Sequence, residues 1–211
     1  MTRQQPDVSR CLPGFEHVRR SWEPIYECWA ARILPGQFYV SDSDEVLVTI
    51  LGSCVSACVR DPRSGVGGIN HFLLPSRGSE GSIGAGAAGS SAARYGNFAM
   101  EQLINEILKT GLKREDLEVK ICGGGRMFRR SNDIGAKNIR FVEDYLRLEG
   151  LEPTVRDLGG VRPRRVHYFP ATGRLRIKKL AAVESSMLLD EEARYRRDLD
   201  SGSLAGNIEL F

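Results

Sequence analysis

Apolar and polar residues along this chain switch several times between a strand-like and a helix-like period. Residues 46–50 are apolar and β-branched, which is typical of a buried strand. Two more apolar runs, residues 55–60 and 66–74, flank the turn signal at residues 61–65, where Asp and Pro open the turn. This arrangement predicts a β-hairpin. Residues 117–121 alternate between apolar and charged, which predicts a half-buried strand.

Helical periodicity follows in two places. Apolar residues recur at helical spacing in a segment that ends at Gly111, namely Met100, Leu103, Ile104, Ile107 and Leu108. Residues 133–148 repeat the pattern and end at Gly150. A short strand at residues 154–158 and a hairpin at residues 166–178 complete the series. Strands and helices in this order predict an α+β fold, a layered α/β sandwich with mixed, largely antiparallel sheets and two main helices.

The chain divides into three parts by composition. Residues 36–183 carry the regular patterns and form the predicted domain. Residues 1–35 contain four prolines and are interpreted as an N-terminal extension, with one amphipathic helical turn that docks Trp22, Ile25, Tyr26 and Trp29. Residues 184–211 are polar and lean acidic, so we interpret them as a solvated tail, including the basic segment 194–197.

Composition restricts the class of protein. The 211 residues are 41% hydrophobic and 27% charged, an ordinary globular balance, and the net charge of +3 is too small to indicate nucleic-acid binding. There is no apolar run of 18 residues and no signal-peptide pattern near the N-terminus, which predicts no membrane insertion and no export. Five irregularly spaced cysteines then indicate free thiols in a reducing cytoplasm.

Two biased segments allow further expectations. Residues 78–91 are almost entirely Gly, Ser and Ala, which predicts a mobile loop, and we expect it to border the substrate entrance. Residues 162–179 contain seven Lys and Arg residues and no acid. Solvated charges on a sheet edge explain this run, and an acidic partner remains the alternative.

The predicted hairpin brings together a cysteine and a histidine. If its turn is centred between Pro62 and Arg63, Cys54 and His71 lie directly opposite one another. Opposed residues of an antiparallel pair point to the same face with Cβ atoms about 4.5–5.5 Å apart. A thiol beside an imidazole is the arrangement of a nucleophile with its base. A bulge at Gly65 would shift this register.

The residues before the cysteine favour the same chemistry. After Gly52 the backbone can turn sharply, so the N–H groups of Ser53 and Cys54 can point at one spot. Free amides there would lower the pKa of the thiol and hold the oxyanion of a tetrahedral intermediate. The alternative is that Cys54 is a small buried hydrophobic residue of an apolar strand.

A metal site fits the sequence less well. Cys54 and Cys58 would be about 13 Å apart along a strand, too far to share a zinc ion. His17 and His167 have no paired ligand spacing. Residues 123–126, Gly-Gly-Gly-Arg, lack the pattern of a phosphate-binding loop, so we interpret them as a tight turn beside the site. We therefore predict neither a metal nor a cofactor.

Several motifs in the same order resemble the chemoreceptor glutamine deamidase family, CheD. The resemblance covers residues 36–179. It rests on the string from Thr49 to Val55, on Gly68-Ile-Asn-His71-Phe-Leu-Leu-Pro75, and on shorter pieces: Arg94-Tyr95-Gly96, Ala99-Met100-Glu101, Gly123–Phe128, Ile134–Asn138, Asp157–Gly160 and Thr172-Gly173. It implies a fold similar to the catalytic domain of a bacterial toxin that deamidates a glutamine of small GTPases.

The resemblance also implies an activity and a set of site residues. The family consists of cytoplasmic hydrolases that convert glutamines of methyl-accepting chemotaxis receptors to glutamate and release ammonia. Its nucleophile matches Cys54, its base matches His71, and a threonine that completes the triad matches Thr49. Gly52 and Ser53 would contribute the oxyanion-binding backbone.

Two alternatives to this function stay open at the level of sequence. The same cysteine and histidine would serve an amidase or a transamidase acting on another amide. CheD-like proteins also bind a CheC-type phosphatase, so the chain could be an interaction module without turnover. The partners implied are therefore the helical cytoplasmic domain of receptors and a CheC-type phosphatase.

Overall fold

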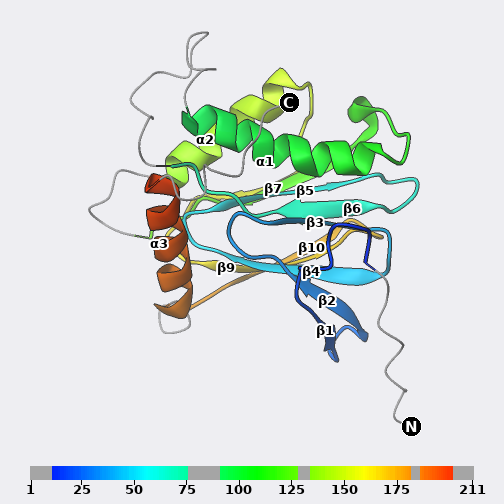
Figure 1. The fold of residues 1–211 in the computed structure, drawn as a ribbon, viewed down its shortest axis with the longest axis horizontal. Coiled ribbons are helices and arrows are strands. Elements are labelled where there is room, and N and C mark those ends of the chain that lie inside the picture. Colours follow the sequence, from blue (N-terminus) through cyan, green and yellow to red (C-terminus); the bar gives the residue numbers. More distant parts are fainter. Residues whose placement is uncertain (1–10, 76–90, 128–133, 182–185, 202–211) are drawn as a thin grey trace.

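The computed structural model describes residues 11–75, 91–127, 134–181 and 186–201. These residues form three layers (Figure 1). Helices α1 (Ser91–Leu108) and α2 (Ile134–Leu148) cover one face of a sheet, and a second sheet lies on the other side of that sheet. The predicted α+β layered sandwich is confirmed, with a third long helix, α3 (Ser186–Asp200), added to the two that were expected.

Each sheet has five strands among the described residues. The outer sheet has the order β1 (Arg20–Glu23), β2 (Cys28–Arg32), β4 (Glu45–Leu51), β9 (Arg164–Phe169), β10 (Arg174–Lys179). The middle sheet has the order β3 (Phe38–Ser41), β6 (Gly67–Asn70), β5 (Val55–Arg60), β7 (Glu118–Gly123), β8 (Val155–Leu158). The pairs β2–β4 and β7–β8 are parallel, and the other pairs are antiparallel.

The middle sheet is buried on both faces, which explains its sequence. Every residue of β5 is buried, so its apolar run does not alternate. The α1 side chains at the predicted apolar positions pack on this sheet with none of their surface exposed, as at Met100, Leu103, Ile104 and Ile107. A short 3₁₀ turn at Arg114–Asp116 leads into β7. The packed core fixes the strand ends on which the candidate site is built.

The N-terminal prediction of a helical turn is wrong. Residues 20–32 form the β1–β2 hairpin, and β2 adds parallel to β4. Trp22 and Trp29 are directly paired across the hairpin, with their rings edge to face and 6.0 Å between centroids. The aromatic residues whose spacing suggested a helical face form a cross-strand pair instead, and such pairs stabilise a sheet.

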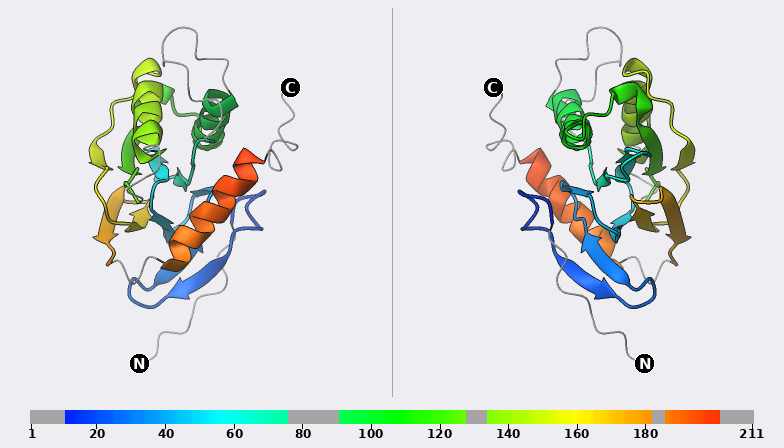
Figure 2. Two further views of the ribbon diagram at one scale, coloured as in Figure 1. Left: turned by 90° about the vertical axis from the view of Figure 1, so that its left-hand side faces the viewer. Right: turned by 90° about the vertical axis from the view of Figure 1, so that its right-hand side faces the viewer.

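The C-terminal prediction of a solvated tail is also wrong for the described part. Helix α3 crosses one end of the layers (Figure 1), and Figure 2 shows it running diagonally over that end. Glu192 on α3 is only 7% exposed. The predicted loop at residues 78–91 lies outside the described residues apart from Ser91, the first residue of α1.

The predicted hairpin register is wrong by two residues. Cys58 pairs with Ile69, and Val55 bridges to Phe72, so Cys54 would face residue 73 rather than His71. The turn is wider than predicted. The carbonyl oxygen of Asp61 accepts a hydrogen bond from Gly65 N, and Asp61 N donates to the carbonyl oxygen of Val66. Gly65 has a φ of 77°. A shift of two keeps the same face, so Cys54 and His71 are diagonal neighbours.

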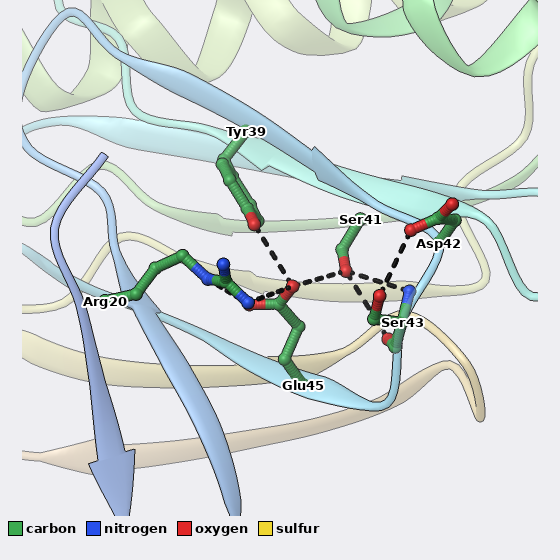
Figure 3. Close-up of polar contacts among 6 residues, drawn as sticks. All are labelled: Arg20, Tyr39, Ser41, Asp42, Ser43 and Glu45. Carbon is green, nitrogen blue, oxygen red and sulfur yellow. Dashed lines mark hydrogen bonds and ion pairs between the residues drawn. The ribbon is translucent and has the colours of Figure 1, made fainter. Parts of the chain in front are cut away.

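A buried carboxylate joins the two sheets (Figure 3). Glu45 of β4 is 1% exposed and accepts hydrogen bonds from Tyr39 and Ser41 of β3, at 3.1 and 2.9 Å. Arg20 of β1 forms an ion pair with it at 3.2 Å. Because β3 belongs to the middle sheet and β1 and β4 to the outer one, this network ties the layers together.

Removing this carboxylate is expected to be strongly destabilising. Glu45→Ala removes the buried carboxylate that Arg20, Tyr39 and Ser41 contact, which costs about 3–5 kcal/mol of unfolding free energy. Asp44→Ala is the matched control, because Asp44 is the exposed neighbouring carboxylate. Urea denaturation of both variants measures the difference. Equal stability of the two would contradict a structural role for the network.

None of the helices in the described residues has both the length and the apolar character needed to cross a membrane.

Candidate active site

The loop between β4 and β5 is held by its carbonyl groups. Gly125 N donates to the carbonyl oxygen of Gly52 at 2.8 Å, and Gly124 N donates to that of Cys54 at 2.7 Å. Asn138 Nδ2 of α2 donates to the carbonyl oxygen of Ser53 at 2.9 Å. Three consecutive carbonyls are thereby satisfied by the segment after β7 and by α2.

The N–H groups of this loop converge on one side chain. Gly52 N and Cys54 N donate to Oε1 of Glu192 at 2.7 and 3.3 Å, and Ser53 N donates to Oε2 at 2.9 Å. The hydroxyl of Ser53 adds a bond of 3.0 Å to Oε2. The loop is therefore a built site for the oxygens of a carboxyl group, and the same donors suit a tetrahedral oxyanion.

The glycines after β7 allow this approach. Gly123 and Gly124 have φ angles of 115° and 69°, which glycine adopts without strain. A Cβ atom at Gly123 would overlap the carbonyl oxygen of Cys54. Residues 123–125 lie in direct contact with the cysteine loop, as expected, but residues 124–127 form irregular backbone rather than the predicted tight turn.

The imidazole of His71 is oriented by Thr49. The backbone of His71 pairs with the segment before β3, through His71 N to Gln37 O at 2.9 Å and Gly36 N to His71 O at 2.7 Å. Its Nδ1 lies 2.8 Å from the Thr49 hydroxyl, and that hydroxyl donates to the carbonyl oxygen of Ile33 at 2.8 Å. A hydroxyl has one proton, so Thr49 accepts from Nδ1–H. The Nε2 atom then carries the lone pair of a base.

The structure brings the predicted residues together. Sulfur of Cys54, a ring nitrogen of His71 and a carboxylate oxygen of Glu192 lie within 4.8 Å of one another. Nε2 of His71 is buried and has no hydrogen-bond partner among the described residues. A cavity of about 270 Å³ reaches Thr49, His71 and Glu192 from the side of the outer sheet. The cavity therefore gives a small molecule a path to the base, whereas the Cys54 sulfur beside that base is fully buried.

The pKa of the Cys54 thiol differs from the value expected from the sequence. Burial, and next the Glu192 carboxylate, raise the pKa of the Cys54 thiol well above its usual value of 9. Burial lowers the pKa of His71 to about 4, although the Glu192 carboxylate opposes this shift. The expected lowering of the thiol pKa by free amides is wrong for this arrangement, because burial has the largest effect and the Glu192 carboxylate, which occupies those amides, acts in the same direction. Both members of the pair are neutral near pH 7.

The lowered pKa of His71 makes stability depend on pH. Between pH 6.5 and 4 the unfolded state binds a proton that folded His71 does not. We therefore expect the free energy of unfolding to fall, by up to about 3 kcal/mol, as pH is lowered through this window. His71→Gln should flatten the dependence, whereas His17→Gln, at an exposed position, should keep it. Equal slopes for the two variants in urea denaturation would contradict this assignment.

The same three side chains could also be read as a zinc site, since cysteine, histidine and carboxylate are zinc ligands. However, the Glu192 carboxylate already accepts four hydrogen bonds from Gly52, Ser53 and Cys54. Its oxygens are thus directed at the loop. We therefore interpret the cluster as a thiol and a base beside an anion-binding loop, the class of site used in acyl transfer through a covalent cysteine intermediate.

Comparisons with known proteins agree with this class. The family model described as CheD chemotactic sensory transduction matches residues 73–179. A protein of Halorhodospira halophila is 51% identical over 204 residues, which cover 97% of this chain and 94% of the relative. Proteins of Rhodopseudomonas palustris, 45% identical with both chains fully covered, and Hahella chejuensis, 42% identical with 99% and 96% covered, are also similar. Each relative is named a probable chemoreceptor glutamine deamidase CheD.

The chain belongs to the CheD family. The similarity reaches beyond residues 36–179, because the alignments include most of the N-terminal segment and of the C-terminal segment. The family expected from the motifs is confirmed.

Sequence reasoning missed two residues that contact the loop at Cys54. Asn138 was part of a motif but had no role, and the structure shows its amide between Ser53 O and Leu74 N, at 2.9 Å from each. Glu192 was assigned to a tail. The helical spacing of Glu192, Tyr195 and Leu199 was a signal that one face of this segment is buried.

Proposed function

We propose that this chain hydrolyses the side-chain amide of glutamine residues in chemoreceptors, giving glutamate and ammonia. Its relatives are named for this activity. One observation carries the proposal: the loop at Cys54 holds the side-chain carboxylate of a glutamate, which is the product of the reaction, beside the thiol and the imidazole.

The first half of the reaction forms a thioester. Cys54 transfers its proton to Nε2 of His71 as its sulfur attacks the carboxamide carbon. The negative charge on the carboxamide oxygen is stabilised by the N–H groups of Gly52 and Cys54, which now bind Oε1 of Glu192. The C–N bond then breaks, and His71 gives its proton to the departing ammonia.

The second half releases the product. Water enters beside His71, where the cavity meets the site. Nε2 takes a proton from this water as it attacks the thioester carbon, and the C–S bond breaks to restore the Cys54 thiol. Thr49 keeps Nδ1 protonated throughout, so that Nε2 faces the reacting atoms as the base.

The test is mass spectrometry of a receptor cytoplasmic fragment before and after incubation with the full chain. We expect glutamine residues to become glutamate, and a parallel incubation with Cys54→Ala to leave them unchanged. Adding a free primary amine separates hydrolysis from transamidation, since a transamidase would attach the amine. A receptor fragment left unmodified by the wild-type chain would overturn the proposal.

The partners follow from the same function. The receptor's helical cytoplasmic domain is the substrate, so the protein acts in the cytoplasm. Binding of a CheC-type phosphatase is a separate proposal that rests on the family resemblance alone. A pull-down with the Cys54→Ala protein tests it, because capture of the phosphatase would be independent of catalysis.

A further inference from the structure

The nucleophile is closed off in this structure. Cys54 has none of its surface exposed, and the three N–H groups at the loop are engaged by Glu192. An amide substrate needs both the sulfur and those donors. Among the described residues, Glu192 is the side chain that holds all three N–H groups, and it comes from α3 rather than from the sheets.

A second anchor holds α3 one helical turn further along. Tyr195 exchanges a hydrogen bond with Tyr95 of α1 through their hydroxyls, and its ring packs against Gly36. Leu199 also packs against the core. Glu192, Tyr195 and Leu199 share one helical face, whereas Arg194, Arg197 and Asp198 are exposed. The helix face that packs against the domain therefore also carries the glutamate side chain that binds the loop.

We propose that α3 is an internal mimic of the reaction product. It occupies the surface of this domain on which the receptor helix docks, so that a receptor must displace α3 to be deamidated. This inference rests on the proposed function. It assigns the substrate as a glutamine presented from an α-helix, with its side chain where Glu192 lies and its next turn against Tyr95 and Gly36.

The charge of Glu192 supports a closed, inactive arrangement. Burial, and next this carboxylate, raise the pKa of the Cys54 thiol, so Glu192 adds to the effects that keep the nucleophile protonated while α3 is bound. A receptor glutamine is neutral and would not have this effect. Displacement of α3 therefore frees the oxyanion donors and removes the repulsion of the thiolate in one step.

The test compares Glu192→Ala with Asp198→Ala in the full chain. Asp198 is an exposed acid on the same helix, so its removal matches the change in charge. The readout is the rate of alkylation of Cys54 by iodoacetamide, followed by peptide mapping, with buried Cys58 as an internal reference. If α3 occupies the site nine-tenths of the time, alkylation of Cys54 rises about tenfold in Glu192→Ala. Asp198→Ala stays at the wild-type rate.

Tyr195→Ala removes the other anchor and is expected to accelerate alkylation in the same way, which gives a second test should Glu192→Ala fold poorly. Alkylation of Cys54 at the wild-type rate in both variants would overturn the inference. The alkylation readout does not depend on receptor chemistry. Faster alkylation without any receptor deamidation would therefore reject the proposed function, and only the closure of the Cys54 loop by α3 would remain.

The kinetics of receptor deamidation test the same inference in the active enzyme. Glu192→Ala is expected to lower the apparent KM for a receptor fragment about tenfold at unchanged kcat, because the competing helix no longer holds the site. A fall in kcat instead would mean that Glu192 takes part in catalysis, which contradicts the product-mimic role.

Discussion

Cys54→Ala is expected to lower kcat for receptor deamidation by at least about a thousandfold, because the proposed thioester forms on the Cys54 sulfur. The fold should survive, since the loop at Gly52–Cys54 is held through backbone carbonyls rather than through the thiol. Release of ammonia from a receptor fragment measures the effect.

Cys58→Ala is the matched control. Cys58 is equally buried but belongs to the interior of β5, where its thiol contacts Cys122. We expect its replacement to reduce stability modestly and to leave kcat unchanged. His71→Ala should cost about as much activity as Cys54→Ala, and the double variant should cost little more, because the two residues act as a unit. Activity in Cys54→Ala above a hundredth of the wild type would refute the assignment.

Thr49→Val is expected to lower kcat about 100- to 1,000-fold, the second largest effect, without a large change in KM. Valine has the shape of threonine but cannot accept from Nδ1–H of His71, so the imidazole loses the contact that keeps Nε2 as the base. Thr49→Ser retains a hydroxyl and should restore most of the activity.

Comparison of the valine and serine variants distinguishes a role of Thr49 in orienting His71 from a general loss of folded structure. A structural defect would lower activity equally in Thr49→Val and Thr49→Ser, and it would also appear as a loss of unfolding free energy. Rescue by serine, together with a shift in the pH profile of kcat in Thr49→Val, is the expected outcome. Full activity in Thr49→Val would show that Thr49 does not orient the base.

Most of the regular structure could be predicted from local pattern. The run at residues 55–60 coincides with β5 because a doubly buried strand is continuously apolar and is bounded by a glycine loop and by Asp61 and Pro62. Helix α2 begins within one residue of the expected start and ends at the expected residue. The apolar pattern and the end residues of these elements are local in sequence, so they can be recognised without knowledge of the fold.

The candidate site was predicted through a register that is wrong. The turn at Gly65 is wider than expected, yet Cys54 and His71 still meet, because a shift of two residues retains the side-chain face of a strand. A shift of one would have turned His71 away from the cysteine. The motif resemblance assigned the same residues independently of that geometry.

The remaining contacts are non-local, which is why sequence reasoning missed them. Glu192 and Gly52 are 140 positions apart, and Asn138 lies 85 positions from Ser53. No local period or turn signal relates such positions. The β1–β2 hairpin was missed for a related reason, since its pairing with β4 decides that residues 28–32 are a strand.

The most direct measurement is peptide mapping of the enzyme after acid quenching during turnover of a receptor fragment. A covalent glutamine-derived thioester requires that a receptor peptide be attached to Cys54 through the former carboxamide carbon, with ammonia already lost. The account predicts this adduct on Cys54, and on none of the other four cysteines. Formation of glutamate with Cys54 unmodified at every quench time would contradict it.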